Sequence, residues 1–88
     1  MIPKIIDYAS VFSNIGVIYT DLGQYQLAID HFNEAIRLDP FSGETLNKRA
    51  YAYFKTDNLL AACRDARKAC EIGNCKILRY LVSQRLCR

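Results

Sequence analysis

The four cysteines and the single histidine carry the most reactive side chains of this sequence. No cysteine pair has C-x2-C spacing, so neither a zinc ribbon nor a thioredoxin-type motif is present. Cys63 and Cys70 stand seven residues apart on one predicted helix, roughly 10 Å along its axis, which is beyond disulfide reach. A disulfide from Cys75 to either Cys70 or Cys87 stays geometrically possible. We expect the thiols to act mainly as packing residues, because free cysteine packs well in cores.

Catalytic motifs are also absent from the sequence. His31 lies between Asp30 and Phe32 on a predicted helix, and no nucleophile stands at a fixed spacing from it. There is no G-x-S-x-G, H-E-x-x-H, phosphate-binding glycine loop or EF-hand pattern. We therefore expect His31 at a helix edge or surface, and we expect no enzyme activity, no cofactor and no metal site.

The composition favours one small helical domain. Eighty-eight residues support at most one domain, and 51% apolar residues argue against disorder. Only two prolines and four glycines interrupt the chain, which favours helices over a sheet with many turns. No apolar run resembles a membrane span or a secretory signal. We expect a cytoplasmic protein, periplasmic or secreted only if a signal has been removed.

The charge is distributed unevenly along the chain. Residues 1–44 carry two basic and six acidic side chains, whereas residues 45–88 carry ten basic and three acidic ones. This asymmetry favours acidic partners or head-to-tail contacts, although solvated helix faces would give the same pattern. Basic residues beside aromatics can bind single-stranded nucleic acid, but Tyr53 and Tyr80 fall at predicted core positions. We therefore do not expect nucleic-acid binding.

A repeat with a period of 34 residues organises the sequence. After that shift Tyr19 aligns with Tyr53, Ala28 with Ala62 and Ala35 with Ala69, and apolar or small residues coincide at many further positions. Within each unit the apolar residues recur every three or four positions, which indicates amphipathic helices. We expect helices over 8–21, 24–38, 43–55, 58–72 and 75–87, with caps from Ser42, Asp57 and Asn74 and helix ends at Gly23 and Gly73.

The first unit carries a recognisable motif. Phe12-x2-Ile15-Gly16-x2-Tyr19, then Ala28-x3-Phe32, Ala35 and Pro40, resembles the tetratricopeptide pattern W-x2-L-G-x2-Y…A-x3-F…P. The second unit is looser, with Arg49 at the leucine position and Asn74 at the proline position. The resemblance implies an all-α fold, in which antiparallel helical hairpins stack as a short right-handed α-solenoid. We expect a single domain over 1–88, with repeats at about 9–42 and 43–76 and a closing helix at about 75–88.

The same resemblance implies a protein-interaction module, that is, an adaptor or scaffold. The first helix of each hairpin would line a concave groove that holds a peptide or helix of a partner protein, and Lys48 and Lys55 would favour an acidic one. The groove residues would include Asn14, Val17, Asn47, Lys48, Tyr51 and Lys55. A chaperone-tail adaptor is disfavoured, because the matching positions lack the lysines, asparagines and arginine that such adaptors use. The alternative is a structural self-assembly module, or a fragment of a longer repeat array with no peptide ligand.

The predicted closing helix is more apolar than a terminal cap needs to be. Apolar residues occupy about two-thirds of its circumference, whereas packing on one hairpin requires a stripe of a little over 100°. We therefore expect contact with another chain, most simply a homodimer about a two-fold axis. Leu78 and Val82 would form that contact, with Arg85 near its rim. The alternative is that the helix buries its whole apolar arc against the second hairpin.

Overall fold

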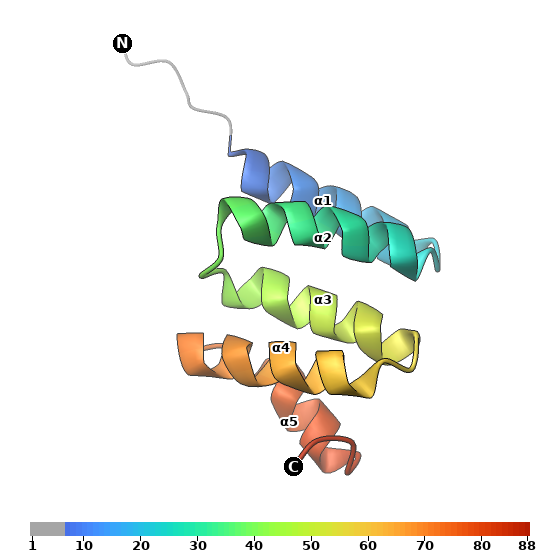
Figure 1. Ribbon diagram of the computed structural model, residues 1–88, viewed down its shortest axis with the longest axis vertical. Helices are drawn as coiled ribbons and strands as arrows, with labels where there is room; N and C mark the ends of the chain where they lie inside the picture. The colour runs from blue at the N-terminus through green and yellow to red at the C-terminus, as the bar shows by residue number, and fades with distance from the viewer. Residues whose placement is uncertain (1–6) are drawn as a thin grey trace.

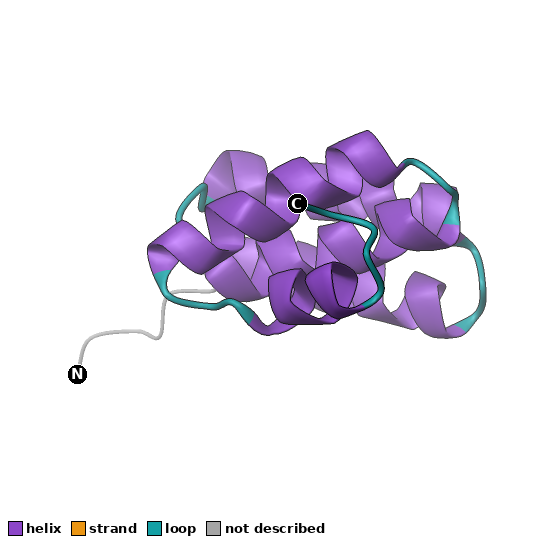
Figure 2. Ribbon diagram, turned by 90° about the horizontal axis from the view of Figure 1, so that it is seen from below, coloured by secondary structure: helices purple, strands orange, loops and turns teal. Residues whose placement is uncertain are grey.

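The computed structural model describes residues 7–88, so the first six residues of the expected domain lie outside the described part. Five α-helices follow one another, and residues 7–88 contain no strand (Figures 1 and 2). Their bounds are α1 Tyr8–Asp21, α2 Tyr25–Leu38, α3 Gly43–Lys55, α4 Leu59–Ile72 and α5 Lys76–Ser83. Helices α1 and α2 form one hairpin, α3 and α4 the next, and α5 packs below them (Figure 1). The expected all-α stack of tetratricopeptide-like hairpins is confirmed.

Local sequence explains most helix ends. Asp7 caps α1 by accepting from the Ser10 backbone N–H, and Ser42 caps α3 by accepting from the N–H of Thr45. Gly23 and Gly73 have φ of 76° and 120°, the left-handed region that lets a chain leave a helix. The expected cap of α4 is wrong, because Asp57 turns at φ 61° and Asn58 caps the helix instead. Cys75 holds the N-cap position of α5 without a side-chain bond, and the expected residue Asn74, one position earlier, accepts from the backbone N–H of Lys76 through its Oδ1.

A close approach of two helices holds the first hairpin together. Gly16 on α1 lies against the Phe32 ring on α2, and a Cβ at position 16 would sit 2.5–2.8 Å from three ring carbons. Phe32 and Ala28 are fully buried. The missing side chain of Gly16 is therefore what lets the Phe32 ring sit directly on the α1 backbone.

Arg49 connects three helices at the position where the repeat pattern has leucine. Its Nε and Nη2 donate to the two carboxylate oxygens of Asp65 on α4 at 2.7 and 2.8 Å, and its Nη1 donates to Asn33 on α2 at 2.9 Å. The guanidinium also lies 5.7 Å from the centroid of the Tyr53 ring. The hydrogen bond to Asp65 raises the pKa of Arg49. A bidentate ion pair thus takes the place of apolar packing within the second hairpin, and the bond to Asn33 links it to the first hairpin.

Helix α5 is shorter than expected, and it ends at Ser83 rather than at residue 87. Arg85 adopts φ 60°, which turns the chain back toward α4. Leu81 is fully buried, and Ile77, Leu78 and Leu86 pack against a cluster that includes Ala50, Ala62 and Ala66. Much of the apolar arc of the closing helix is therefore covered by the second hairpin.

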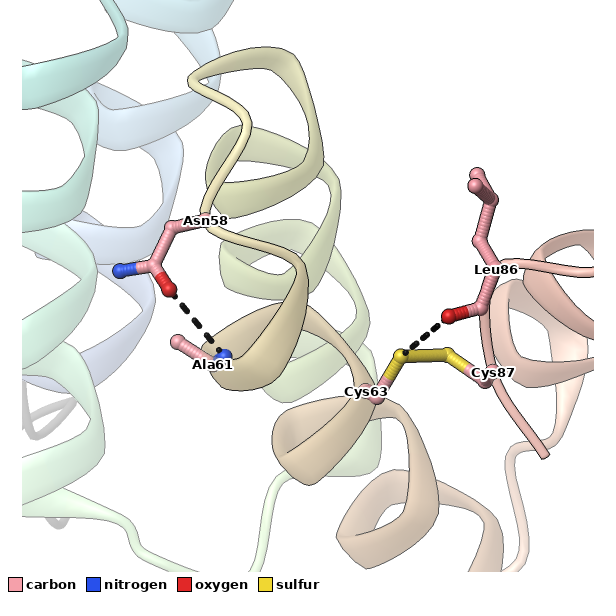
Figure 3. Close-up of a disulfide and its surroundings, with 5 residues drawn as sticks. All are labelled: Asn58, Ala61, Cys63, Leu86 and Cys87. Carbon is pink, nitrogen blue, oxygen red and sulfur yellow. Dashed lines mark hydrogen bonds between the residues drawn. A yellow bond between two sulfur atoms is a disulfide. The ribbon is translucent and has the colours of Figure 1, made fainter.

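The expectation of packing thiols is wrong, because the structure pairs all four cysteines. One disulfide joins Cys63 on α4 to Cys87 beyond α5, with 5.6 Å between the Cα atoms (Figure 3). The other joins Cys70 near the end of α4 to Cys75 at the start of α5. Spacing alone could not show the first pair, because it depends on the chain turning back after residue 84.

The contact between Gly16 and Phe32 predicts two losses of stability. Phe32→Ala removes a fully buried ring and should lower the free energy of unfolding by about 3–5 kcal/mol. Gly16→Ala adds a methyl group where the ring already lies, and should cost about 1–3 kcal/mol. Urea denaturation followed by circular dichroism measures both. Gly23→Ala faces open space and costs stability only through its positive φ, a strain that Gly16 within α1 does not have, so comparing the two variants separates backbone strain from crowding. A neutral Gly16→Ala would contradict this packing.

The Arg49–Asp65 pair predicts strong coupling in a double-mutant cycle. Asp65→Ala leaves a half-buried guanidinium without its carboxylate, which should cost about 3 kcal/mol. The double variant Arg49→Leu/Asp65→Ala should lose clearly less than the sum of the two single variants. Glu34→Ala, which removes the exposed pair with Arg37, is the control and should change stability little. Additive losses would mean that the two side chains do not act as a unit.

Candidate functional site

A cavity of about 610 Å³ lies between α1, α3 and α5. Helix α1 contributes Val17, Thr20 and Asp21, α3 contributes Asn47, Lys48 and Tyr51, and α5 contributes Lys76, Ile77 and Tyr80, with Phe32 of α2 also lining it. We call this cavity the groove. Because α1, α3 and α5 are the first, third and fifth helices, the groove crosses both hairpins and the closing helix.

Most of the predicted groove residues meet in this cavity. Val17, Asn47, Lys48 and Tyr51 all line it. Two predicted residues lie elsewhere. Asn14 lines a neighbouring polar pocket of about 110 Å³ between α1 and α3. Lys55 is exposed at the last turn of α3 and does not line the groove.

Sequence reasoning missed the contribution of α5. Lys76, Ile77 and Tyr80 form one wall of the groove, and the Tyr80 ring meets the Phe54 ring edge-on with centroids 5.9 Å apart. The signal was present in the repeat, because Tyr80 occupies the position of the first motif residue in a third unit. Tyr80 was predicted as a core residue. An outermost helix is covered on one side only, so one side of the Tyr80 ring stays open to the groove.

Asn47 is the polar side chain in the groove whose hydrogen bonding is incomplete. Its Oδ1 is buried, and no donor among residues 7–88 reaches it. A buried carbonyl oxygen without a donor costs about 1–3 kcal/mol relative to a paired one. Asn47 also lines the groove, but this oxygen is closed to solvent, so a bound chain reaches it only if the Asn47 side chain turns.

Two ammonium groups give the groove a basic edge. Lys48 Nζ bonds Glu44 Oε1 at 2.7 Å, and this hydrogen bond lowers the pKa of the Glu44 carboxyl. Lys76 is exposed at the start of α5. Asp21 is the acidic residue among the lining side chains, so the lining carries one more positive than negative charge. This arrangement favours an anionic group near Lys48 and Lys76.

The residues expected to form a dimer differ in exposure. Val82 is 45% exposed and Arg85 is also exposed, whereas Leu78 is partly covered by the core of the second hairpin.

A wider apolar surface lies at the opposite end of the stack. On α1 and its C-cap residue Leu22, Tyr8, Val11, Ile18 and Leu22 are 60%, 42%, 58% and 64% exposed. Their spacing of three, seven and four residues places them on one helical stripe.

Metal clusters and membrane-spanning helices are two features that the part of the chain described by the structure lacks. Residues 7–88 hold no group of three or more His, Cys, Asp or Glu side chains that could bind a metal ion. None of the described helices is both long and apolar enough to cross a membrane. His31 lies at a helix edge, where its Nδ1 bonds the Leu27 carbonyl at 2.8 Å and its ring faces Tyr19.

The fold and the groove define this chain as a helical-repeat protein. Residues 9–42 match the family model described as "Tetratricopeptide repeat". The first hairpin is therefore a tetratricopeptide repeat, and the resemblance predicted from its motif is confirmed. The chain is also similar to the uncharacterized protein ycf37 of Guillardia theta, with 35% identity over 54 residues. That match covers 61% of this chain and 30% of the length of the relative.

The unpaired oxygen of Asn47 predicts an unusual response to substitution. Asn47→Leu removes a buried polar atom that has no donor, so it should leave the free energy of unfolding unchanged or raise it by about 1 kcal/mol. Asn33→Leu is the matched control on α2. It makes the same exchange within a helix but removes the acceptor of an Arg49 hydrogen bond, and should cost about 1 kcal/mol. Urea denaturation decides, and a large loss for Asn47→Leu would contradict the assignment.

Proposed function

We propose that this chain is a non-catalytic adaptor that binds a peptide or helix of a partner protein in the groove. The observation that carries the proposal is the cavity shared by α1, α3 and α5, which has the Asn47 amide among its lining side chains. A side-chain amide can bind the backbone of any bound chain, so it contributes affinity without demanding one sequence. The match of residues 9–42 to a repeat that serves protein interactions supports this class of function.

The ligand that suits the groove has apolar side chains next to a carboxylate. Val17, Ile77 and the rings of Tyr51 and Tyr80 offer apolar and aromatic contacts. Lys48 and Lys76 attract an anionic group, and Asp21 disfavours one on the α1 side. In the free protein Lys48 is bonded to Glu44, so an incoming carboxylate competes with that residue.

Asn14 and Lys55 extend this proposal beyond the cavity. Asn14 is exposed beside the polar pocket, and Lys55 is exposed at the far end of α3. A ligand longer than the groove would reach one of these side chains at each end.

A structural role is the second candidate, and the stripe on α1 favours it. Ile18 corresponds in the 34-residue repeat to Ala52, which is buried in a cluster with Ala28, Ile29 and Phe32 of α2. The same position on α1 is 58% exposed. A further helical layer, from a longer repeat array or from another chain, would cover it. Self-association through Leu78, Val82 and Arg85 on the closing side remains a proposal of the same kind.

A peptide-binding assay tests the adaptor role. The probe is a short fluorescent peptide with leucines next to glutamates, and lysines replace the glutamates in the matched control peptide. Fluorescence anisotropy should show binding of the acidic peptide only. Tyr51→Ala should weaken binding about tenfold or more, as a central aromatic contact does. Glu44→Gln should strengthen it, because Lys48 then lacks an internal partner.

Two variants outside the groove serve as controls. Arg67→Glu changes charge on the outer face of α4, and Ile18→Glu disrupts the α1 stripe. Neither should change peptide affinity by more than about twofold. If Ile18→Glu abolishes an oligomer seen by light scattering while Tyr51→Ala changes nothing measurable, the structural role replaces the adaptor role.

A further inference from the structure

Helix α5 forms a wall of the groove but cannot hold its position by itself. It has eight residues, fewer than an isolated helix needs in water. Its fully buried side chain is Leu81, while Ile77 and Leu78 are only partly covered. The position of Ile77 and Tyr80 in the groove therefore depends on whatever fixes both ends of α5.

Disulfides fix both ends to α4. Cys75, the N-cap of α5, is bonded to Cys70, which lies five residues earlier in the sequence. Cys87, which follows α5, is bonded to Cys63 across a separation of 24 residues. The first bond joins neighbours that the turn at Gly73 already brings together. The second closes a much longer loop, so it restricts the chain far more.

The two disulfides differ in their access to solvent. Cys63 and Cys87 are 5% and 8% exposed, whereas Cys70 and Cys75 are half-buried. A reductant therefore meets the Cys70–Cys75 bond first, and it reaches Cys63–Cys87 only when the tail moves. Cys63 Sγ lies 3.3 Å from the Leu86 carbonyl oxygen, which can accept a hydrogen bond from a thiol at Cys63 (Figure 3).

We propose that the Cys63–Cys87 disulfide is a redox lock that keeps α5 in the groove and so controls ligand binding. Only the effect on ligand binding rests on the proposed function. The release of α5 on reduction is a property of the chain and does not depend on what the groove binds. Reduction frees the tail beyond Ser83, and α5 then leaves its place for part of the time. Affinity falls in proportion to the fraction of molecules in which the α5 wall is in place.

The chemistry is thiol–disulfide exchange with a dithiol reductant. A thiolate of the reductant attacks one sulfur of the protein disulfide, forms a mixed disulfide and releases the other cysteine as a thiolate, which takes up a proton. The second thiol of the reductant then attacks the mixed disulfide and releases the second cysteine. Each cycle passes two electrons and two protons to the protein bond and leaves the reductant as a cyclic disulfide. An oxidant of the disulfide class reverses the reaction.

Two cysteine variants separate the lock from a general loss of stability. Cys63→Ser/Cys87→Ser removes the proposed lock, and Cys70→Ser/Cys75→Ser is the matched control that keeps it. Hydrogen exchange read by mass spectrometry should show residues 76–83 exchanging about tenfold or more faster in the first variant, with α1 and α2 unchanged. The control variant should resemble the oxidised wild type. Wild type treated with dithiothreitol should follow the first variant, so the result does not depend on how the serines pack.

Peptide binding gives the second readout. The leucine–glutamate peptide should bind the lock variant about tenfold more weakly than the control variant. If α5 is equally protected in both variants, the lock is refuted whatever the peptide does. If α5 is released but the oxidised protein binds no peptide, the lock stands as a conformational device and the proposed function fails. If α5 is released and affinity is unchanged, the control of binding is refuted.

The proposed redox lock also bears on the cellular compartment in which the protein is found. Structural disulfides persist in oxidising compartments and are rare in reducing ones. The cytoplasmic location expected from the sequence stays a prediction, and the paired cysteines favour an oxidising compartment instead.

Discussion

The contact between the Gly16 backbone and the Phe32 ring is the constraint on which the other packing depends. It sets how closely α1 and α2 approach, and Phe32 also lines the groove. A larger residue at position 16 would push α1 outward and carry Val17 and Asp21 away from α3. The same glycine therefore determines both the packing of the first hairpin and the width of the groove on its α1 side.

The helical architecture was predictable from the sequence, because the spacing of the apolar residues and the residue types at the helix ends indicated the same helices. The three- and four-residue spacing around Gly16 and Ala28 identified the first hairpin, and Ser42 marked the start of α3 correctly. Where two candidates for a cap stood side by side, local signals could not decide. Asp57 and Asn58 both suit a cap, and the backbone turn at Asp57 selected Asn58.

The groove was predicted on its α1 and α3 walls and missed on its α5 wall. Helical periodicity places Asn47, Lys48 and Tyr51 on one face, so their convergence follows from the repeat. The position of Tyr80 depends instead on how α5 tilts, and that depends on the tether at Cys87. Contacts between residues distant in sequence carry no periodic signal, so the Cys63–Cys87 disulfide, like the bond between Arg49 and Asp65, appears only in the folded chain, whereas the spacing of Cys70 and Cys75 left their pairing open.

The unequal ends of the stack give it a direction. At one end the exposed stripe from Tyr8 to Leu22 has the shape and apolarity of a surface that another helix layer would cover. At the other end the Cys63–Cys87 bond fastens α5 across α4, where a following hairpin would otherwise pack. The oxidised chain therefore presents different surfaces at its two ends, an uncovered apolar stripe at the α1 end and a tethered helix at the α5 end. Any array that includes it is polar, because its two ends differ.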